Sequence, residues 1–159
     1  MLWGEFEAAA PEVAKPGRKR LEDSRVALLG TLRRDGSPRI SPIEPVFAGS
    51  HLLLGVMTRS AKASDLLRDP RCVLHSAISD PDAAELELKL YGRVEEAVDE
   101  ARAIPPDAWW SSRPREDARV YSLRIEQAAL VAWDLTRGLM TVTQWRRERG
   151  SDVRTRPYP

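Results

Sequence analysis

The sequence predicts one mainly β domain with short helices, folded as an antiparallel β-barrel or sandwich. Three observations indicate this fold class. About seven segments have the length and pattern of strands, tight turns join several of them, and helical spacing is brief where it occurs. A chain of 159 residues can bury about two-thirds of its unfolded surface in one core. We therefore treat residues 1–159 as a single domain.

The N-terminal segment, residues 1–20, is predicted to be helical at its start. Apolar residues recur there at helical spacing, at Trp3, Phe6, Ala10 and Val13. Pro11 interrupts this spacing, so we expect one short helix or two abutting helices. The charged run 16–20 follows, and we interpret it as a basic, solvated connector.

A hairpin is predicted next in the chain. Residues 26–32 form an apolar strand, the Asp35-Gly36 pair is a strong turn signal, and residues 38–47 return. The returning strand holds three prolines, so it must be bent, bulged or at a sheet edge. Within it, Arg39 and Ser41 share one face because side chains alternate along a strand.

The stretch 51–70 is the centre of the functional prediction. Residues 52–57 form a buried strand, and the helix that follows has Ser60 as its N-cap and ends at the Asp69-Pro70 step. The turn between them carries hydroxyls and cations, at Thr58, Arg59, Ser60 and Lys62. With the free N–H groups of a helix start, these residues are the components of a phosphate site, although an ordinary capped turn that binds only water has them too.

The rest of the chain is predicted to be mostly strand. Strands are expected at residues 72–78, 86–94, 119–125, 128–133 and 139–145, and 119–133 is expected to be one long strand or two. Short helices are expected at 97–104 and 105–110. The tail, residues 146–159, is basic and is predicted to be partly disordered.

Composition excludes several classes of partner. The 25 basic and 24 acidic side chains leave a net charge of +1, which argues against nucleic-acid binding. No apolar run approaches the ~20 residues of a membrane span and no signal pattern is present, so we expect no membrane partner. The single cysteine, Cys72, fits a reducing compartment. We expect the protein to be cytoplasmic.

Side chains for self-contained catalysis are scarce. His51 and His75 are isolated in sequence, so no metal site is expected, and His75 is interpreted as a core or interface residue. The sequence has no phosphate-loop, dinucleotide or nucleophile-elbow motif. We therefore assign no catalytic residue. If the protein is an enzyme, a bound cofactor supplies the chemistry.

Four segments carry a resemblance to a known family. They are the hairpin 26–42, the strand, turn and helix at 52–66, and the segments 69–75 and 88–94. In their order and spacing they resemble the flavin-binding split β-barrel proteins, the pyridoxamine 5′-phosphate oxidase-like superfamily. The resemblance covers residues 25–98 well and the remainder loosely.

This resemblance implies a six-stranded split barrel that forms a homodimer, with a cofactor at each of two sites in the interface. The phosphate contacts that it implies are Arg39, Thr58, Ser60 and Lys62, while Arg59 points to phosphate or to solvent. The ring system would be bordered by Ile40, Ser41, Val56 and Met57. Trp145 would reach a cofactor across the dimer or pack in the core. The family's C-terminal signature for pyridoxamine phosphate is not found, so activity on that compound is not expected.

Three functional hypotheses follow. The first is an oxidoreductase that uses FMN to move hydride to or from a small organic substrate; a deazaflavin coenzyme is the alternative cofactor. The longer acidic tail of a deazaflavin would favour extra cations, such as Arg18, Lys19, Arg20 and the C-terminal arginines. The second hypothesis is a non-enzymatic flavin or haem carrier or sensor on the same barrel. The third, an oligonucleotide-binding barrel, is disfavoured by the balanced charge.

Overall fold

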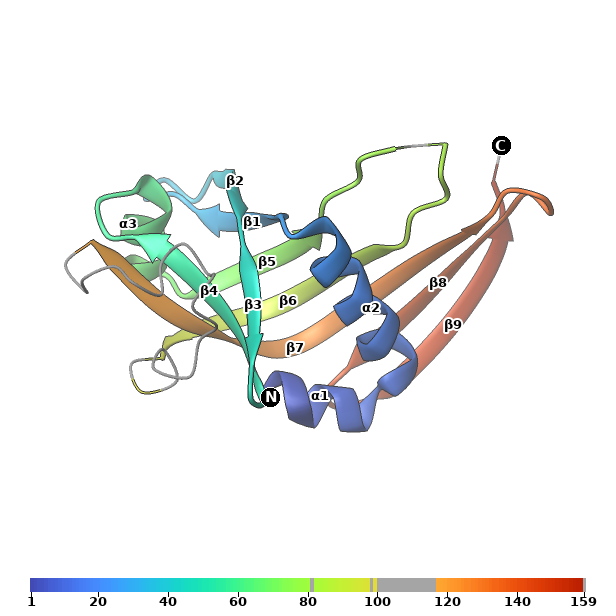
Figure 1. The fold of residues 1–159 in the computed structure, drawn as a ribbon, viewed down its shortest axis with the longest axis horizontal. Coiled ribbons are helices and arrows are strands. Elements are labelled where there is room, and N and C mark those ends of the chain that lie inside the picture. The colour runs from blue at the N-terminus through green and yellow to red at the C-terminus, as the bar shows by residue number, and fades with distance from the viewer. Residues whose placement is uncertain (81, 98, 100–116, 159) are drawn as a thin grey trace.

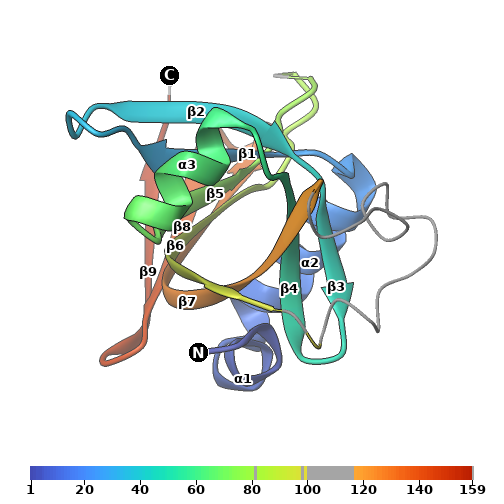
Figure 2. The same cartoon turned by 90° about the vertical axis from the view of Figure 1, so that its left-hand side faces the viewer.

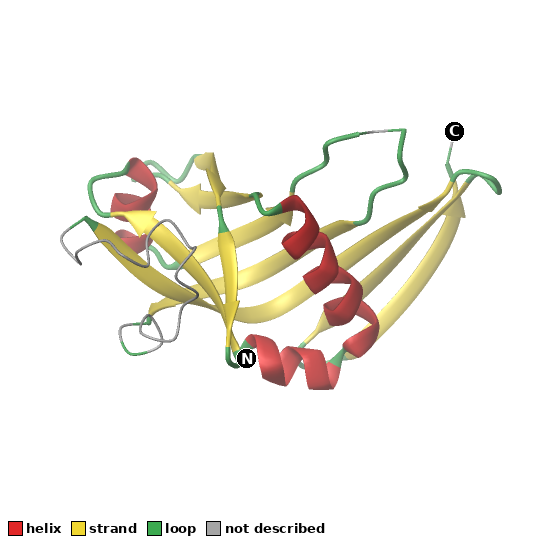
Figure 3. Ribbon diagram, viewed as in Figure 1, coloured by secondary structure: helices red, strands yellow, loops and turns green. Residues whose placement is uncertain are grey.

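The structure is a computed structural model that describes residues 1–80, 82–97, 99 and 117–158. Its helices and strands are shown in Figures 1 and 3. They are α1 (Trp3–Ala9), α2 (Pro11–Ser24), β1 (Ala27–Leu32), β2 (Pro38–Ile43), β3 (Pro45–Ala48), β4 (His51–Met57), α3 (Ala61–Arg68), β5 (Arg71–Ser76), β6 (Glu87–Glu96), β7 (Ala118–Asp134), β8 (Leu139–Arg146) and β9 (Gly150–Pro157). The predicted mainly β fold with short helices is confirmed.

All the strands belong to one antiparallel sheet that curls on itself (Figure 2). The main path runs β2-β1-β5-β6-β7-β4-β3. The 17-residue strand β7 is the point at which the sheet divides into two branches, one through β4 and one through β8. One edge of β7 pairs with β6, while the other pairs first with β4, through residues 118–122, and then with β8, through residues 127–134. Within the described residues the sheet has nine strands, and the six-stranded closed barrel that the resemblance implied stays a prediction.

The predicted hairpin is confirmed, and its second strand is broken in the way the prolines indicated. Gly36 has a φ of 82° in the turn, a left-handed conformation that glycine adopts without strain. The return strand predicted at 38–47 is two strands, β2 and β3, separated by Glu44. These two strands are the two ends of the sheet path, so each has an edge on which proline is tolerated.

The solvated connector predicted at residues 16–20 is wrong, because these residues lie within helix α2. Gly17 packs so closely against Leu88 of β6 that an added Cβ would lie 2.8 Å from a leucine methyl. Ion pairs one helical turn apart support the same stretch, Arg18–Glu22 at 2.9 Å and Lys19–Asp23 at 2.7 Å. Packing and pairing therefore outweigh Pro16, the local signal for a break. The two abutting helices predicted around Pro11 are α1 and α2.

The C-terminal tail is also more ordered than predicted. Residues 150–157 form β9, which pairs with β8 along its whole length. Every side chain of β9 is exposed, so backbone hydrogen bonds hold this strand in the sheet. Its sequence has no alternation of apolar and polar residues from which a strand could be predicted. Residues 119–133 lie in one strand, β7. The helices predicted at 97–104 and 105–110 fall outside the described residues, apart from Ala97 and Asp99.

An aromatic cluster of the core lies where α1 and α2 pack on the sheet. Its aromatic rings meet edge to face at centroid distances of 4.7–5.5 Å, in the pairs Trp3–Phe6, Trp3–Phe47 and Phe6–Trp145. Helix α3 lies elsewhere, against β1 and β4, and it is the helix that follows the predicted phosphate turn. No helix in the described ranges is long and apolar enough to cross a membrane.

Candidate functional site

The candidate site begins at the turn from β4 into α3. Ser60 is the N-cap of α3, as predicted, and its Oγ accepts a hydrogen bond from Ala63 N–H at 3.3 Å. Because the hydroxyl oxygen is the acceptor in this bond, its own proton remains able to donate. The Ser60 N–H donates to Met57 O at 3.0 Å and closes the turn. The first-turn N–H groups of Ala61 and Lys62 have no carbonyl four residues earlier within the helix to accept from them.

Strand β2 and helix α3 are joined at two points. Arg39 of β2 donates from Nε to Asp65 Oδ2 of α3 at 2.7 Å. Three residues further along β2, the Pro42 carbonyl accepts a hydrogen bond from Lys62 Nζ, which lies three residues earlier in α3. The helix therefore runs antiparallel to the strand, and the two cations predicted to bind phosphate both lie at this contact.

A hollow of about 320 Å³ adjoins the contact. It lies between the end of β2 and the last three residues of β4, which continue past the last pair of β4 with β3. Its lining is mostly apolar with one charge of each sign, and it consists of Val26, Pro42, Ile43, Glu44, Gly55, Met57 and Lys62. An apolar hollow with a few polar groups at one side is the usual form of a small-molecule site.

The ionisable groups around this contact have shifted pKa values. Burial lowers the pKa of the Lys62 ammonium below its ordinary value. Burial raises the pKa of the Asp65 carboxyl, but hydrogen bonds from Arg39 and Thr31 and the charge of Arg39 outweigh it, so the net pKa is lowered. Asp65 is therefore ionised at neutral pH. By contrast, burial raises the pKa of the Cys72 thiol to about 12, which leaves it unreactive at neutral pH.

The structure brings most of the predicted site residues to one region. Met57 and Lys62 line the hollow, while Arg39 bonds Asp65 of α3 and Ser60 caps that helix. Ile40 is 72% exposed on β2. The remaining members of this group are the half-buried Ser41 and Thr58 and the exposed Arg59, on β2 and on the turn.

Two predicted residues do not present their side chains there. Val56 is fully buried in the core, so only its backbone reaches this end of β4. Trp145 is 2% exposed and packs against Phe6 with a centroid distance of 4.9 Å. Within this chain Trp145 is a core residue, the alternative role that the sequence left open.

Asp65 is the residue at this contact that sequence reasoning missed. It is 4% exposed and accepts hydrogen bonds from residues 34 and 26 positions away, Thr31 at 3.0 Å and Arg39 at 2.7 Å. The available signal was an acidic residue between the core positions Ala63 and Leu66 of a short helix. A buried carboxylate requires partners, but those partners cannot be identified before the fold is known.

Other chemistry is not favoured by the part of the chain that the structure describes. Within it, no three His, Cys, Asp or Glu side chains are grouped so that they could hold a metal ion. His75 Nδ1 lies 2.6 Å from Ser76 O, and His51 Nδ1 lies 2.9 Å from Ser122 Oγ. Neither histidine lines the hollow.

Comparisons with known proteins indicate the family of the chain. A family model described as pyridoxamine 5′-phosphate oxidase matches residues 15–132. No protein of curated function matches the sequence significantly.

Several solved structures share the fold. An FMN-binding protein from Nostoc punctiforme is 14% identical, with a TM-score of 0.59 over 96% of this chain and 97% of that one. A haem-binding protein from Mycobacterium smegmatis is 16% identical, with a TM-score of 0.61 over 92% and 88%. PhzG from Burkholderia lata, solved with tetrahydrophenazine-1-carboxylic acid, is 10% identical, with a TM-score of 0.66 over 97% and 92%. At these identities the likeness is one of fold.

Proposed function

The chain belongs to the pyridoxamine 5′-phosphate oxidase family, and from this premise we propose that it binds FMN between two copies of itself and transfers hydride to or from a small organic substrate. The observation that carries the proposal is the junction of β2 and α3. There a capped helix start, two cations and an apolar hollow meet within the matched region. FMN requires those three features, for its phosphate and for its ring.

The helix start fits a phosphate. Lys62 uses one of its three donors on Pro42 O and keeps two for a ligand. The Ser60 hydroxyl, the first N–H groups of α3 and the positive end of the helix dipole face the same ligand, and Arg39 approaches from β2. Arg59, exposed on the turn, adds positive charge. In the proposed complex these groups bind and orient the cofactor.

The hollow fits one wall of a ring site. A volume of about 320 Å³ is at the lower end for a small-molecule site, so one chain encloses only part of a flavin. Two exposed apolar side chains line it, Val26 (38%) and Met57 (54%), and two more, Leu28 (39%) and Ile40 (72%), are exposed on the paired strands β1 and β2. A patch of this kind favours burial against another surface, and we propose that a second copy of the chain covers it and completes the site.

The positions of the cations favour FMN over a deazaflavin. The residues proposed to bind a longer acidic tail are engaged elsewhere: Arg18 pairs with Glu22, Lys19 with Asp23 and Arg20 with Glu85. Among the C-terminal arginines, Arg154 pairs with Asp152, and Arg146, Arg147 and Arg149 line a separate hollow with Glu126 and Glu148. None of these lines the hollow beside α3.

The chemistry follows from this division of roles. When bound, FMN supplies the hydride acceptor or donor. Of the described residues that line the hollow, Glu44 and Lys62 alone are ionisable, so we propose that the chain binds, orients and excludes water and leaves redox chemistry to the cofactor. Pyridoxamine phosphate is not proposed as the substrate, because the family's signature for it is not found in the sequence.

An absorption spectrum of the purified protein, with FMN titration and a measurement of molecular mass, tests the proposal. We expect a flavin spectrum or saturable quenching of added FMN, in a particle of twice the 17.9 kDa chain mass. A haem spectrum, or quenching of a deazaflavin alone, would replace FMN with that cofactor. Tight FMN binding without turnover by any reductant would indicate a carrier. A monomer that binds FMN would remove the shared interface from the proposal.

A further inference from the structure

We propose that Asp65 is a positioning residue, which holds Arg39 in the orientation that binds the cofactor phosphate. This inference rests on the proposed function and assigns a role to a carboxylate that has no direct contact with the ligand in that proposal. Asp65 lies in α3 three residues after Lys62, so one short helix carries a phosphate cation and the group that orients the other cation.

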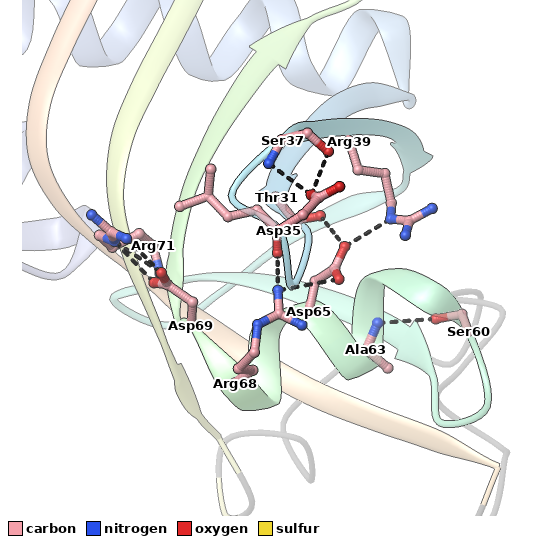
Figure 4. A network of polar contacts seen from close by, with 11 residues as sticks. Thr31, Asp35, Ser37, Arg39, Ser60, Ala63, Asp65, Arg68, Asp69 and Arg71 are labelled. Atoms are coloured by element: carbon pink, nitrogen blue, oxygen red, sulfur yellow. Dashed lines mark hydrogen bonds and ion pairs between the residues drawn. The ribbon is translucent and has the colours of Figure 1, made fainter.

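Asp65 connects three elements of the fold. Its Oδ2 accepts from Thr31 Oγ1 of β1 at 3.0 Å and from Arg39 Nε of β2 at 2.7 Å, and its Oδ1 lies 3.4 Å from Arg68 Nη2 of α3 (Figure 4). Arg68 also donates to the Leu32 carbonyl at the end of β1. The carboxylate is 4% exposed, so these bonds lie in a region of low dielectric where they are strong. They hold the middle and the end of α3 against β1 and β2.

The contact with Asp65 leaves the two terminal nitrogens of the Arg39 guanidinium free to bind a ligand. Only Nε is bonded to Asp65, and Figure 4 shows the two terminal nitrogens directed away from that carboxylate. Among the described residues, the Arg39 side chain has no other hydrogen-bond or ion-pair partner, and it is 27% exposed. The guanidinium is a planar fork, so fixing Nε also fixes the directions of the terminal N–H groups. Those N–H groups are the ones that bind a phosphate in two-point fashion.

The charges of the network are compatible with an anionic ligand. Two guanidiniums, of Arg39 and Arg68, surround one carboxylate, so the three side chains carry a net charge of +1. The alternative role of Asp65 is a simple counter-charge, which would weaken phosphate binding by repulsion. The two roles predict opposite effects when the charge of Asp65 is removed, because loss of a positioning group lowers affinity whereas loss of a repelling group raises it.

The test compares FMN with riboflavin, which has the same ring without phosphate. Asp65→Asn is expected to weaken FMN binding about tenfold, the effect of losing one charge-assisted hydrogen bond, and to leave riboflavin binding unchanged. In an Arg39→Ala background, Asp65→Asn is expected to have no further effect on FMN, because Asp65 acts through Arg39. A merely structural role would weaken both ligands in both backgrounds.

Asp69→Asn is the matched control. Asp69 ends the same helix and pairs with Arg71 at 2.6 Å, so this variant removes the same charge without touching Arg39. If Asp65→Asn does not fold, Arg39→Lys tests the same geometry, because an ammonium keeps the charge but loses the fork, and a selective loss of FMN affinity is expected. Unchanged or tighter FMN binding in whichever variant folds would overturn the inference. Failure of the wild-type protein to bind FMN would overturn the proposed function along with it.

Discussion

Helices cover the sheet at two places, and they do so with opposite chemistry. At the lower centre of Figure 1, α1 and the adjoining α2 pack with rings and aliphatic side chains, and Trp3, Phe6 and Trp145 are each at most 2% exposed. At the left, α3 meets β1 and β2 through the hydrogen-bonded groups of Thr31, Arg39 and Asp65 and borders an open hollow. The first region is sealed, whereas the second combines the buried apolar Ala63 and Leu66 with a buried polar network and an open, mostly apolar hollow.

The difference indicates where function lies. Burying apolar surface stabilises a fold without further conditions, whereas a buried carboxylate such as Asp65 is costly unless every partner is in place. A chain that needed only stability would cover β1 and β2 with apolar side chains. The retention of charge at α3, beside cations that are not all neutralised, supports the ligand site proposed at that end.

The largest effect is expected from disrupting the sealed region. Trp145→Ala should lower the free energy of unfolding by about 3–5 kcal/mol, because it leaves a cavity beside Phe6. Urea unfolding measures the loss. Trp133→Ala is the control, because this half-exposed tryptophan contacts Tyr158 outside the core and should cost less. Trp145→Phe, which retains a ring, should bind FMN as wild type does. A selective loss of FMN affinity in that variant would place Trp145 in the cofactor site after all.

A second effect, on affinity, is expected at the α3 end. Arg39→Ala combined with Lys62→Ala should weaken FMN binding by about 100-fold or more, since two charge-assisted contacts to phosphate are lost, and should spare riboflavin. Fluorescence titration measures both. Lys19→Ala combined with Arg71→Ala removes the same charge from exposed pairs elsewhere and serves as control. Equal losses in the two double variants would mean that general electrostatic attraction, rather than this site, binds the phosphate.

The fold could be predicted from the sequence where an element depends on neighbouring residues, and not where it depends on distant packing or strand pairing. Local signals were sufficient for the hairpin at Gly36, the cap at Ser60 and the alternation of β6, because each depends on neighbouring residues. They failed for Gly17 and its basic neighbours, which are helical because the glycine packs on Leu88. They failed again for β9, whose pairing with β8 is made by backbone groups that carry no sequence signature.

The residues of the candidate site also differ in whether they could be predicted from neighbouring residues alone. The turn 58–62 was predictable because cap, hydroxyls and cations are contiguous in sequence. Asp65 was not, because its partners Thr31 and Arg39 come from β1 and β2 and meet it only when the sheet has formed. The role of Trp145 stayed open for a related reason, since a tryptophan at a strand end has the same local pattern in a core and in a ligand site.

The smallest effect is expected on the pH dependence of FMN affinity, through the protonation of Lys62. It tests whether the ligand depends on a cation of the open region beside α3. Burial lowers the pKa of this ammonium in the free protein, and a bound phosphate stabilises the charged form and raises that pKa again. Binding therefore takes up a proton only at pH values between the two pKa values, so FMN affinity should be constant below the free-state pKa and should fall as the pH rises through it toward the bound-state pKa.

The expected fall is less than about tenfold per pH unit, the limit for a single linked proton. Riboflavin titrated in parallel should show no such change, since it has no phosphate. Lys62→Arg should abolish the dependence, because a guanidinium stays charged throughout this range. If the arginine variant shows the same fall in FMN affinity as wild type, another group carries the proton, and Lys62 is one cation of the open region rather than the one the phosphate depends on.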